Sequence, residues 1–381
     1  MAIAATLLMT AGGAASGKSS GMNCSRDLPH GQRGLPAAVV VTTDCGLYRL
    51  GTDGSVAYTG KWKSPVPQVA RGYWTDLTWY GVDHAHVLIG RGMKRLWRSH
   101  DTYPRGRSLD VSSVIIGNGR VAFSYYQDRQ SRVLVARFGG AEHVVARGEV
   151  PFVFTPSGDL VSWEERGHAL VLHTANGRER TLARHAVDAQ VDRANEKVFF
   201  RSARQLLVFD GVSVRRLLSL PTVGITGPPT VEPLGRLVAV HDRHRLVIVG
   251  NDRRLVASTV LPRSRHRVDG VSSPVAANAD GSAFAFTVTS GNLARETVYL
   301  LAADTHRGRP LHSQRFVGGG CGAGAWPAWR GHWVIYSNAG QQAAVVDSSG
   351  HAPAVDLGDV IAKLPGLQDN GEGMFNVDWS A

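Results

Sequence analysis

Apolar and polar residues alternate along most of the chain from residue 37 onward, in short runs separated by Gly, Asn and Asp. This period of two predicts half-buried β-strands joined by turns, because successive strand side chains point to opposite faces. Helical periodicity is almost absent, and only the stretch 356–364 is compatible with a short helix. The pattern therefore predicts an all-β protein.

One four-stranded unit recurs along these alternating runs. A short polar–apolar strand turns at Gly, Asn or Asp into a strongly apolar strand. A hairpin then leads to a second apolar strand, and a DG- or NG-like turn precedes an Arg/Val strand. Copies begin at Thr75, Val111, Val150, Val187, Pro228, Val271 and Ala325. Such a repeat is typical of β-propeller blades.

The two ends of the chain supply one further copy between them. The run AAVVVTTDCGLYRLGTDGSVAYTG, from Ala37, lacks its first strand, and Met374–Ala381 is a lone strand similar to the AWPAW that opens the Ala325 copy. Pairing the last strand with the first blade would close the ring and remove its free edges. We predict a single propeller over 37–381, closed in this way, with eight blades, or seven if the Thr75 copy is an irregular insertion.

Three short segments match parts of a W-S-P-D-G turn: Trp379-Ser380, Ala279-Asp280-Gly281 and, loosely, Thr155-Pro156-Ser157-Gly158. On these residues the chain resembles the TolB-like, WD-like propeller repeats of bacterial envelope proteins. The Gly-His and Trp-Asp pairs of true WD repeats, the sialidase Asp-box and the tryptophan motif of quinoprotein propellers are absent from the sequence. The resemblance implies a fold and does not identify a function.

The N-terminus indicates export. Residues 2–11 are apolar and small residues follow, with Gly13 and Ala15 at suitable cleavage positions, although the usual preceding basic residues are missing. We expect a signal peptide over 1–20, a flexible lead-in over 21–36 and a secreted or cell-envelope protein. No apolar run reaches the ~18 residues of a membrane span, so we expect a protein that is not integral to a membrane.

The run AGGAASGKSSG at 11–21 fits both the phosphate-loop pattern and the G-x-S-x-G elbow of hydrolases. Both motifs need a strand before them and a helix after them. Pro29, Gly31, Gly34 and Pro36 follow instead and make such a helix improbable. Gly-, Ala- and Ser-rich composition accounts for both matches, so neither predicts a function.

Three cysteines are too few for a disulfide scaffold, and their spacing does not fit a zinc site. Cys45 falls on the first blade and Cys321 on the crossover into the last, so a Cys45–Cys321 disulfide would fasten the closure of the ring. Cys24 could compete for either partner through its flexible tether. One disulfide and one spare thiol would fit an oxidising compartment.

The net charge is +11, and arginine carries nearly all of it, because only six of the 42 basic residues are lysines. Arginines concentrate in two consecutive blades and form a candidate basic rim: Arg215, Arg216, Arg243, Arg245, Arg253, Arg254, Arg265 and Arg267. A basic rim fits an acidic protein or an anionic envelope polymer. No aromatic-interleaved basic stripe accompanies the charge, so no nucleic acid is expected. The alternative is a general preference for arginine, spread over solvated turns.

A propeller's innermost strands line its central channel and offer polar candidates. These are Asp76, Ser112, Asp188, Gln190, Thr230, Ser273 and Asn376, with Ser113 and Ser272 beside two of them. Two carboxylates are few for a metal-dependent lactonase or a carboxylate-pair glycosidase. Polar residues are also what any water-filled channel requires.

Two histidine clusters and one acidic loop are the remaining candidates. His84 and His86 lie at strand spacing, as a metal pair requires, but no third ligand is identifiable. These residues, like His241 and His244, are interpreted as solvated turn histidines. The loop 369–372 could hold Ca²⁺ through its oxygen atoms or merely return the chain to the last strand; no other metal or cofactor is expected.

The sequence best supports an exported, monomeric, non-catalytic propeller that binds a protein or an envelope polymer. The alternative is a propeller hydrolase or lyase with its site at one mouth of the channel, which would need converging acid, base or metal ligands. A sensor that binds a small ligand in the channel is a third interpretation.

Overall fold

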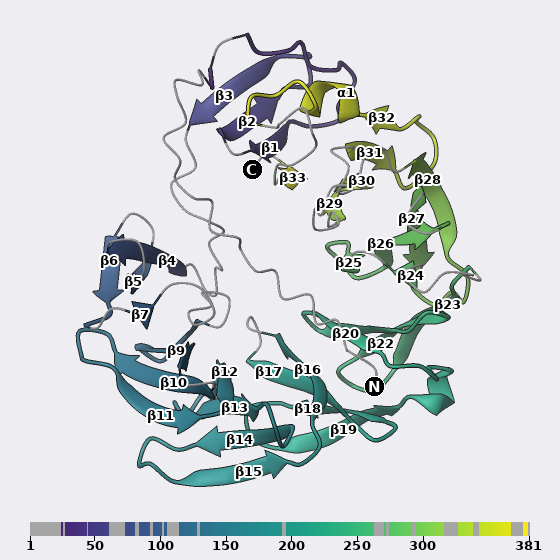
Figure 1. Cartoon of the computed structure of the whole chain (residues 1–381). Helices are drawn as coiled ribbons and strands as arrows, with labels where there is room; N and C mark the ends of the chain where they lie inside the picture. The colour runs from purple at the N-terminus through teal and green to yellow at the C-terminus, as the bar shows by residue number, and fades with distance from the viewer. Residues whose placement is uncertain are drawn as a thin grey trace. The chain divides into compact units, whose positions relative to one another are not determined.

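The computed structural model describes residues 24–25, 27–43, 45–60, 73–80, 84–91, 94–100, 103–104, 114–127, 130–192, 196–262, 270–271, 274–291, 295–315, 327–337, 343–366 and 376–379. These residues are nearly all in strands and turns, and the strands form eight sheets (Figure 1). Two short helical turns accompany them, α1 (Gly358–Ile361) and η2 (Pro221–Val223). The stretch 356–364, whose sequence is compatible with a short helix, thus contains one helical turn.

The strands of the eight sheets have the following bounds. The first two sheets contain β1 (Val39–Thr43), β2 (Gly46–Leu50), β3 (Val56–Gly60) and β33 (Asn376–Trp379), and β4 (Tyr73–Tyr80), β5 (His84–Arg91), β6 (Lys94–Arg98) and β7 (Tyr103–Pro104). The next two contain β8 (Ile115–Gly117), β9 (Arg120–Gln127), β10 (Gln130–Arg137) and β11 (His143–Arg147), and β12 (Glu149–Phe154), β13 (Leu160–Glu164), β14 (Ala169–His173) and β15 (Glu179–Ala183).

The remaining four sheets follow the same plan. Two contain β16 (Val187–Asp192), β17 (Lys197–Ser202), β18 (Gln205–Phe209) and β19 (Val214–Ser219), and β20 (Thr230–Leu234), β21 (Leu237–His241), β22 (Arg245–Gly250) and β23 (Leu255–Val260). The last two contain β24 (Gly270–Val271), β25 (Ala276–Ala277), β26 (Ala283–Ser290), β27 (Arg295–Ala302) and β28 (Arg309–Arg315), and β29 (Ala328–Arg330), β30 (Trp333–Ser337), β31 (Ala343–Asp347) and β32 (Val355–Asp356).

Most of these sheets are meanders in which neighbouring strands follow one another along the chain. Four-stranded antiparallel meanders are the blades of β-propellers, and the protein has the predicted propeller fold. Eight sheets match the eight predicted blades; the number of blades in one ring and the closure of that ring stay predictions. No helix in the described part of the chain is long and apolar enough to span a membrane.

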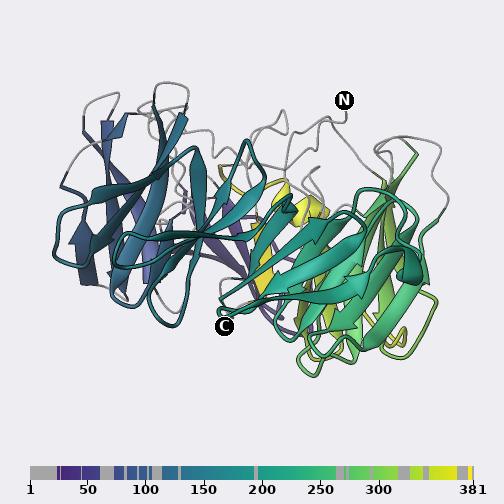
Figure 2. The same cartoon turned by 90° about the horizontal axis from the view of Figure 1, so that it is seen from below.

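Contacts divide the chain into two compact units. The first unit comprises residues 1–63, 239–249 and 255–381, and the second comprises 64–238 and 250–254. Each unit has its own core of apolar strand residues. In the second unit, Leu170 of β14 and Phe200 of β17 belong to one buried cluster, so these two sheets pack face to face (Figure 2).

Central strands are buried and outer strands are exposed, as their sequences predict. The central strand β14, ALVLH, is buried at every position, whereas the last strand of the same sheet, β15, ERTLA, is exposed or half-buried throughout. Continuous apolar runs suit strands covered on both faces, because burial of apolar surface drives the packing.

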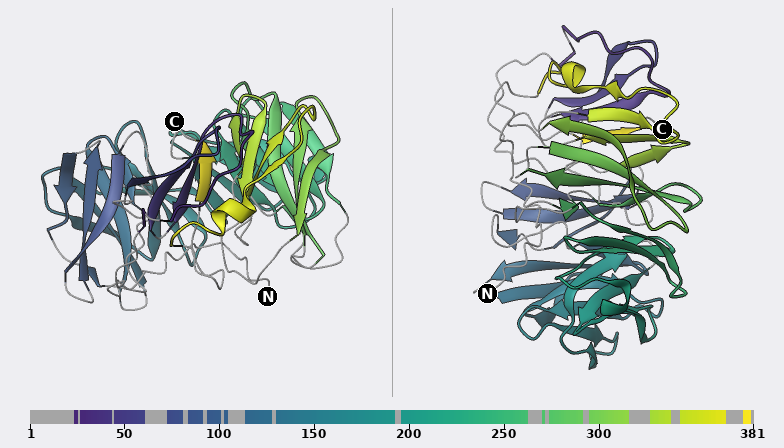
Figure 3. Two further views of the ribbon diagram at one scale, coloured as in Figure 1. Left: turned by 90° about the horizontal axis from the view of Figure 1, so that it is seen from above. Right: turned by 90° about the vertical axis from the view of Figure 1, so that its right-hand side faces the viewer.

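The C-terminal strand completes the first sheet of the first unit. β33 pairs antiparallel with β1, with Val39 opposite Trp379, and the two strands lie side by side in Figures 1 and 3. The predicted pairing is therefore present. The Trp379 indole donates to the Ala328 carbonyl oxygen at 3.0 Å, and the Trp329 indole donates to Ala276 at 2.9 Å. These equivalent bonds explain why the last strand resembles the AWPAW segment.

Candidate functional site

Three of the predicted channel residues lie in the second unit, on the first strands of two sheets. Asp188 and Gln190 lie on β16, Thr230 lies on β20, and these two strands contact each other. Gln190 and Thr230 are exposed, and Asp188 accepts a hydrogen bond from Arg201 Nε at 2.9 Å. Exposed polar groups and one ion pair suit a solvated wall, and whether they bind a ligand stays a prediction.

The other sequence candidates are only partly described. Asp76 and Asn376 lie on β4 and β33. Ser112, Ser113, Ser272, Ser273, Arg265, Arg267, Cys321 and the acidic loop 369–372 lie outside the described residues. Within the residues that are described, no three His, Cys, Asp or Glu side chains are grouped so that they could hold a metal ion.

Two of the histidines are buried, which corrects their interpretation as solvated turn residues. His86 lies on β5 and is 8 % exposed, and His241 ends β21 at 7 %. Nδ1 of His86 lies 2.9 Å from the Ser99 carbonyl oxygen. Because a carbonyl oxygen only accepts, Nδ1 carries the proton, and His86 ties β5 to the chain after β6. His244, in contrast, is exposed as predicted.

A buried polar cluster in the second unit contains the residue types of a hydrolase. Glu149, Ser162 and His173 lie on β12, β13 and β14, and none is more than 8 % exposed. Nε2 of His173 lies 2.7 Å from Glu149 Oε2 and 2.9 Å from Ser162 Oγ, and the Ser162 hydroxyl donates to the same Glu149 oxygen. We call these three residues the Glu149 cluster.

The geometry of the Glu149 cluster does not fit nucleophilic catalysis. A nucleophilic serine must be accessible to a substrate, and its hydroxyl must donate to the histidine that takes up its proton. His173 does contact Ser162 through Nε2, and its Nδ1 lies 3.5 Å from the Glu179 carboxylate. Ser162, however, is fully buried, and its hydroxyl donates to Glu149 instead of His173. Because the polar groups satisfy one another and are buried, the cluster holds three strands together.

A second closed polar site lies in the first unit. Tyr336 on β30 is 1 % exposed, and its hydroxyl lies 2.6 Å from His312 Nδ1 on β28. Burial raises the pKa of Tyr336, as do the charges of Glu296 and Asp356. Burial lowers the pKa of His312, and Asp356 opposes this. The contact joins two neighbouring sheets and leaves the hydroxyl little access to a ligand.

The basic rim stays a prediction, because Arg265 and Arg267 lie outside the described residues. Arg243 precedes β22 and Arg245 is its first residue, whereas Arg253 and Arg254 follow its end. Arg245 is turned inward, and its Nη2 donates to Ser258 Oγ at 3.4 Å. Because β22 is six residues long, the two arginine pairs are separated by the length of a strand.

Four arginines of the second unit do come together, around Asn251. Arg215 Nη1 donates to the Asn251 carbonyl oxygen at 3.1 Å, and the Asn251 amide donates to the Arg236 carbonyl oxygen at 3.1 Å. Arg253 and Arg254 follow Asn251 in the same turn. We call Arg215, Arg236, Arg253 and Arg254 the arginine surface. All four except the half-buried Arg215 are exposed, and Arg216 is exposed beside it on β19.

The two aspartates in these turns are engaged by the backbone. Asp210 Oδ1 accepts from the amides of Val212 and Ser213, and its Oδ2 lies 3.4 Å from Arg215 Nε. Asp252 Oδ1 accepts from the Arg254 amide at 3.1 Å. Partial burial raises the pKa of Asp210, but the Ser213 and Val212 amides and Arg215 outweigh this and hold that pKa below its ordinary value. Both aspartates keep their negative charge, and the four arginines outnumber them, so the surface carries excess positive charge.

Sequence reasoning missed two members of this region. Arg236 lies in the β20–β21 turn, and it comes near the others only because its carbonyl oxygen accepts from Asn251. Val212, between β18 and β19, is 79 % exposed, more than any other exposed large apolar side chain in the described part of the chain. Each is a single residue in a turn, and no sequence motif marks it.

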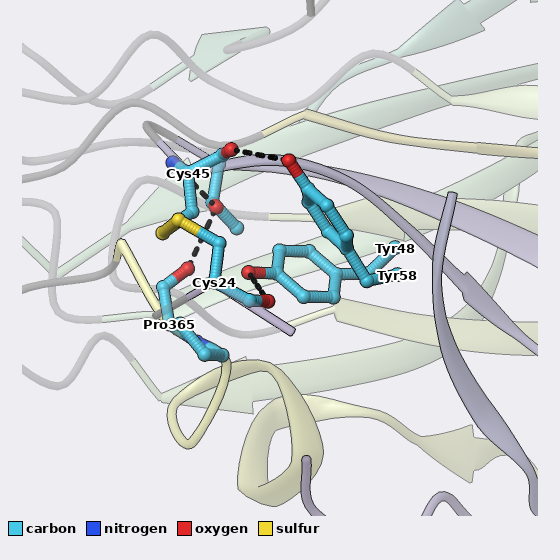
Figure 4. Close-up of a disulfide and its surroundings, with 6 residues drawn as sticks. Cys24, Cys45, Tyr48, Tyr58 and Pro365 are labelled. Carbon is cyan, nitrogen blue, oxygen red and sulfur yellow. Dashed lines mark hydrogen bonds between the residues drawn. A yellow bond between two sulfur atoms is a disulfide. The ribbon is translucent and has the colours of Figure 1, made fainter. Parts of the chain in front are cut away.

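The disulfide joins Cys45 to Cys24, which corrects the predicted Cys45–Cys321 pairing (Figure 4). Two tyrosines of the first sheet hold it. The Tyr48 hydroxyl donates to the Cys24 carbonyl oxygen at 2.9 Å, and the Tyr58 hydroxyl donates to that of Cys45 at 3.3 Å. Burial, followed by the neighbouring Tyr58, raises the pKa of Tyr48 to about 12.

The reason for this pairing is the path of the chain before β1. Leu28 and Leu35 pack on the core of the first sheet, and the Gly31 amide donates to the Gly54 carbonyl oxygen at 2.9 Å. These contacts hold the segment after Cys24 against the sheet that contains Cys45. On the other side, Thr43 donates to the Pro365 carbonyl oxygen at 2.8 Å, so three distant segments meet at the β1–β2 turn (Figure 4).

Comparisons with known proteins do not assign the chain to a family. No protein-family model and no curated protein matches the chain. Similar solved structures include the dihydro-heme d1 dehydrogenase NirN in complex with DHE, at 14 % identity over 88 % of this chain and 78 % of that one, with a TM-score of 0.47. BamB from Moraxella catarrhalis is 13 % identical over 86 % and 96 % of the two chains, with a TM-score of 0.39. The β-propeller domain of the Trilobed protease from Pyrococcus furiosus is 9 % identical over 77 % and 96 %, with a TM-score of 0.37.

Proposed function

We propose that this protein is an exported β-propeller that binds an anionic partner, an acidic protein or an envelope polymer, through the arginine surface and without catalysis. The observation that carries the proposal is the gathering of Arg215, Arg236, Arg253 and Arg254 around Asn251. The two aspartates in the same turns are held by backbone amides. Exposed guanidinium groups with few counter-charges attract carboxylate or phosphate groups and bind them bidentately.

Two further features support this proposal. The Cys24–Cys45 disulfide suits a protein that folds in an oxidising compartment, as the apolar N-terminus also predicts. The Glu149 cluster combines a serine, a histidine and a glutamate, but its side chains are buried and bond to one another. A binding surface therefore explains the accessible chemistry better than the alternative of a hydrolase or lyase.

The proposal is tested by measuring the binding of fluorescently labelled poly-L-glutamate and polyphosphate to the full chain by anisotropy. An electrostatic contact weakens when salt is raised from about 50 to about 500 mM, because the screening length then falls well below 10 Å. Binding that is absent, or indifferent to salt, would contradict the proposal.

A matched pair of charge reversals locates the site. Arg236→Glu with Arg254→Glu reverses two charges of the arginine surface, and Arg137→Glu with Arg147→Glu reverses two exposed charges on β10 and β11 of the same unit. Both double variants change the net charge equally. We expect the first to weaken binding at least about tenfold, which corresponds to about 1.4 kcal/mol, and the second to change it little. Equal effects would mean that total charge, and not this surface, attracts the anion.

A further inference from the structure

Four hairpin turns of the chain share one hydrogen-bonding pattern. The amide of the first residue donates to the carbonyl oxygen of the fifth, and the amide of the fourth donates to the carbonyl oxygen of the first. These turns span residues 51–55, 155–159, 174–178 and 250–254. The shared pattern makes their positions directly comparable, although the turns come from different sheets.

The fourth position of these turns requires a left-handed backbone, and Arg253 is its exceptional occupant. The position is held by Gly54, Gly158 and Gly177, with φ of 84°, 86° and 80°, whereas the turn at 250–254 places Arg253 there with φ of 74°. Among the other described turns with the second hydrogen bond, Gly224, Gly281 and Gly350 also occupy this position with positive φ. Arg253 therefore stands where these turns have a left-handed glycine.

A residue with a Cβ atom is disfavoured in the left-handed region, and glycine is not. The Arg253 side chain is exposed and, within the described part of the chain, forms no hydrogen bond or ion pair that would offset this strain. Nine described residues other than glycine have a positive φ, and Arg253 is the one arginine or lysine among them. Strain at an exposed cation that the described chain does not engage is consistent with a role in binding.

Val212 lies in the neighbouring turn, and Arg215 fixes the two turns together. Arg215 Nε lies 3.4 Å from Asp210 Oδ2 at the base of the Val212 turn, and its Nη1 donates to the Asn251 carbonyl oxygen in the Arg253 turn. The 79 % exposure of Val212 leaves an aliphatic side chain beside a group of cations. An inorganic polyanion has no apolar group to cover it, whereas a polypeptide does.

We propose that the partner of the arginine surface is an acidic polypeptide segment. One of its carboxylates pairs with Arg253, and an apolar side chain close to that carboxylate covers Val212. The inference rests on the proposed function, because it names the partner of the same surface. Charge complementarity selects an acidic segment, and Val212 selects a polypeptide over a phosphate polymer.

Three labelled probes of similar length test the class of partner with the full chain: a random Glu/Tyr copolymer, poly-L-glutamate and polyphosphate. We expect the copolymer to bind more tightly than either homopolymer. Val212→Ser should weaken copolymer binding about fivefold, the size expected for covering part of one aliphatic side chain, and leave polyphosphate binding unchanged. Polyphosphate that binds as tightly as the copolymer, or a Val212→Ser change without effect, overturns the inference while the proposed function stands. Failure of all three probes removes the proposed function itself.

A second pair of variants tests Arg253. Arg253→Gly should weaken binding of both acidic polypeptides about tenfold, as for an arginine at the centre of an interface, and should raise the midpoint temperature of unfolding by relieving the left-handed strain. Gly177→Arg introduces the same strain in the equivalent turn at 174–178, and it should lower that midpoint without changing binding. The role of Arg253 is refuted if Arg253→Gly leaves binding unchanged or lowers the midpoint, because the arginine would then serve the fold.

Discussion

The Glu149 cluster and the arginine surface are both polar regions of the second unit, but only one has capacity left for a partner. In the cluster, a serine, a histidine and a glutamate occupy three adjacent strands and consume one another's hydrogen-bonding groups. In the arginine surface, the aspartates are engaged by turn amides, and Arg236 and Arg253 are exposed. The residue types alone do not show this difference, because a serine, a histidine and a glutamate also occur together in hydrolase sites.

This difference follows from the cost of burial. A buried polar group must find partners inside the protein, since leaving it unpaired costs free energy comparable to a lost hydrogen bond or more. A charged group in a turn stays hydrated and can exchange water for a ligand. Buried polar groups that hydrogen-bond to one another therefore stabilise the fold, whereas exposed charged groups remain available to bind a ligand.

The largest change in the free energy of unfolding should come from disrupting the Glu149 cluster. Glu149→Ala leaves His173 and Ser162 buried without their shared acceptor, and we expect it to lower the free energy of unfolding by about 3–5 kcal/mol. Urea denaturation measures this change. Glu179→Ala is the control, because Glu179 also faces His173 but its side chain is 62 % exposed, and an exposed pair contributes at most about 1 kcal/mol. A Glu149→Ala variant as stable as this control would show that the cluster does not hold the strands.

An intermediate effect should come from Arg215, which serves both the fold and the surface. Arg215→Ala removes the contacts to Asp210 and Asn251, and we expect a loss of about 1 kcal/mol in the free energy of unfolding together with weaker anion binding. Arg216→Ala changes the next, exposed residue of β19 and should cost less than about 0.5 kcal/mol. Denaturation and anisotropy on the two variants separate the roles. If the two variants behave alike, Arg215 does not couple the turns.

The smallest effect should be the contribution of Asp210 to the pH dependence of stability. Its pKa in the folded state lies below the unfolded value of about 3.9, so the unfolded chain binds more protons between the two values and stability falls as the pH falls through them. Asp210→Asn should therefore be less stable than the parent above this window, and the difference should shrink as the solution is acidified. Denaturation midpoints at several pH values measure it. A difference that stays constant with pH would mean that the Asp210 charge contributes nothing.

Local patterns predicted the strands well. Val187, where one repeat was placed, is the first residue of β16, and the repeat placed at Val150 begins one residue after β12 does. The lone C-terminal strand was recognised because its tryptophan repeats the position of Trp329. The alternation of apolar and polar residues that marks a strand involves only a few consecutive residues, so it can be read directly from the sequence.

Contacts that depend on packing were not predictable in the same way. Cys24 meets Cys45 because Leu28 and Leu35 pack on the first sheet, and no spacing rule contains that contact. Arg236 joins the arginine surface through a backbone bond to Asn251. Arg253 is different, because comparing NDRR with TDGS and ANGR across the repeats would have shown an arginine in the place of glycine.

The pairing of β33 with β1 also imposes an order on biosynthesis. β1, β2 and β3 leave the ribosome early, but the strand that covers the edge of β1 is made only when residues 376–379 are translated. Until then the nascent chain presents an unpaired strand edge, which is a template for intermolecular pairing. Contacts this distant in sequence also form slowly. The Cys24–Cys45 disulfide spans 21 residues, so once both cysteines reach an oxidising compartment it can close and fix the β1–β2 turn before the last strand pairs.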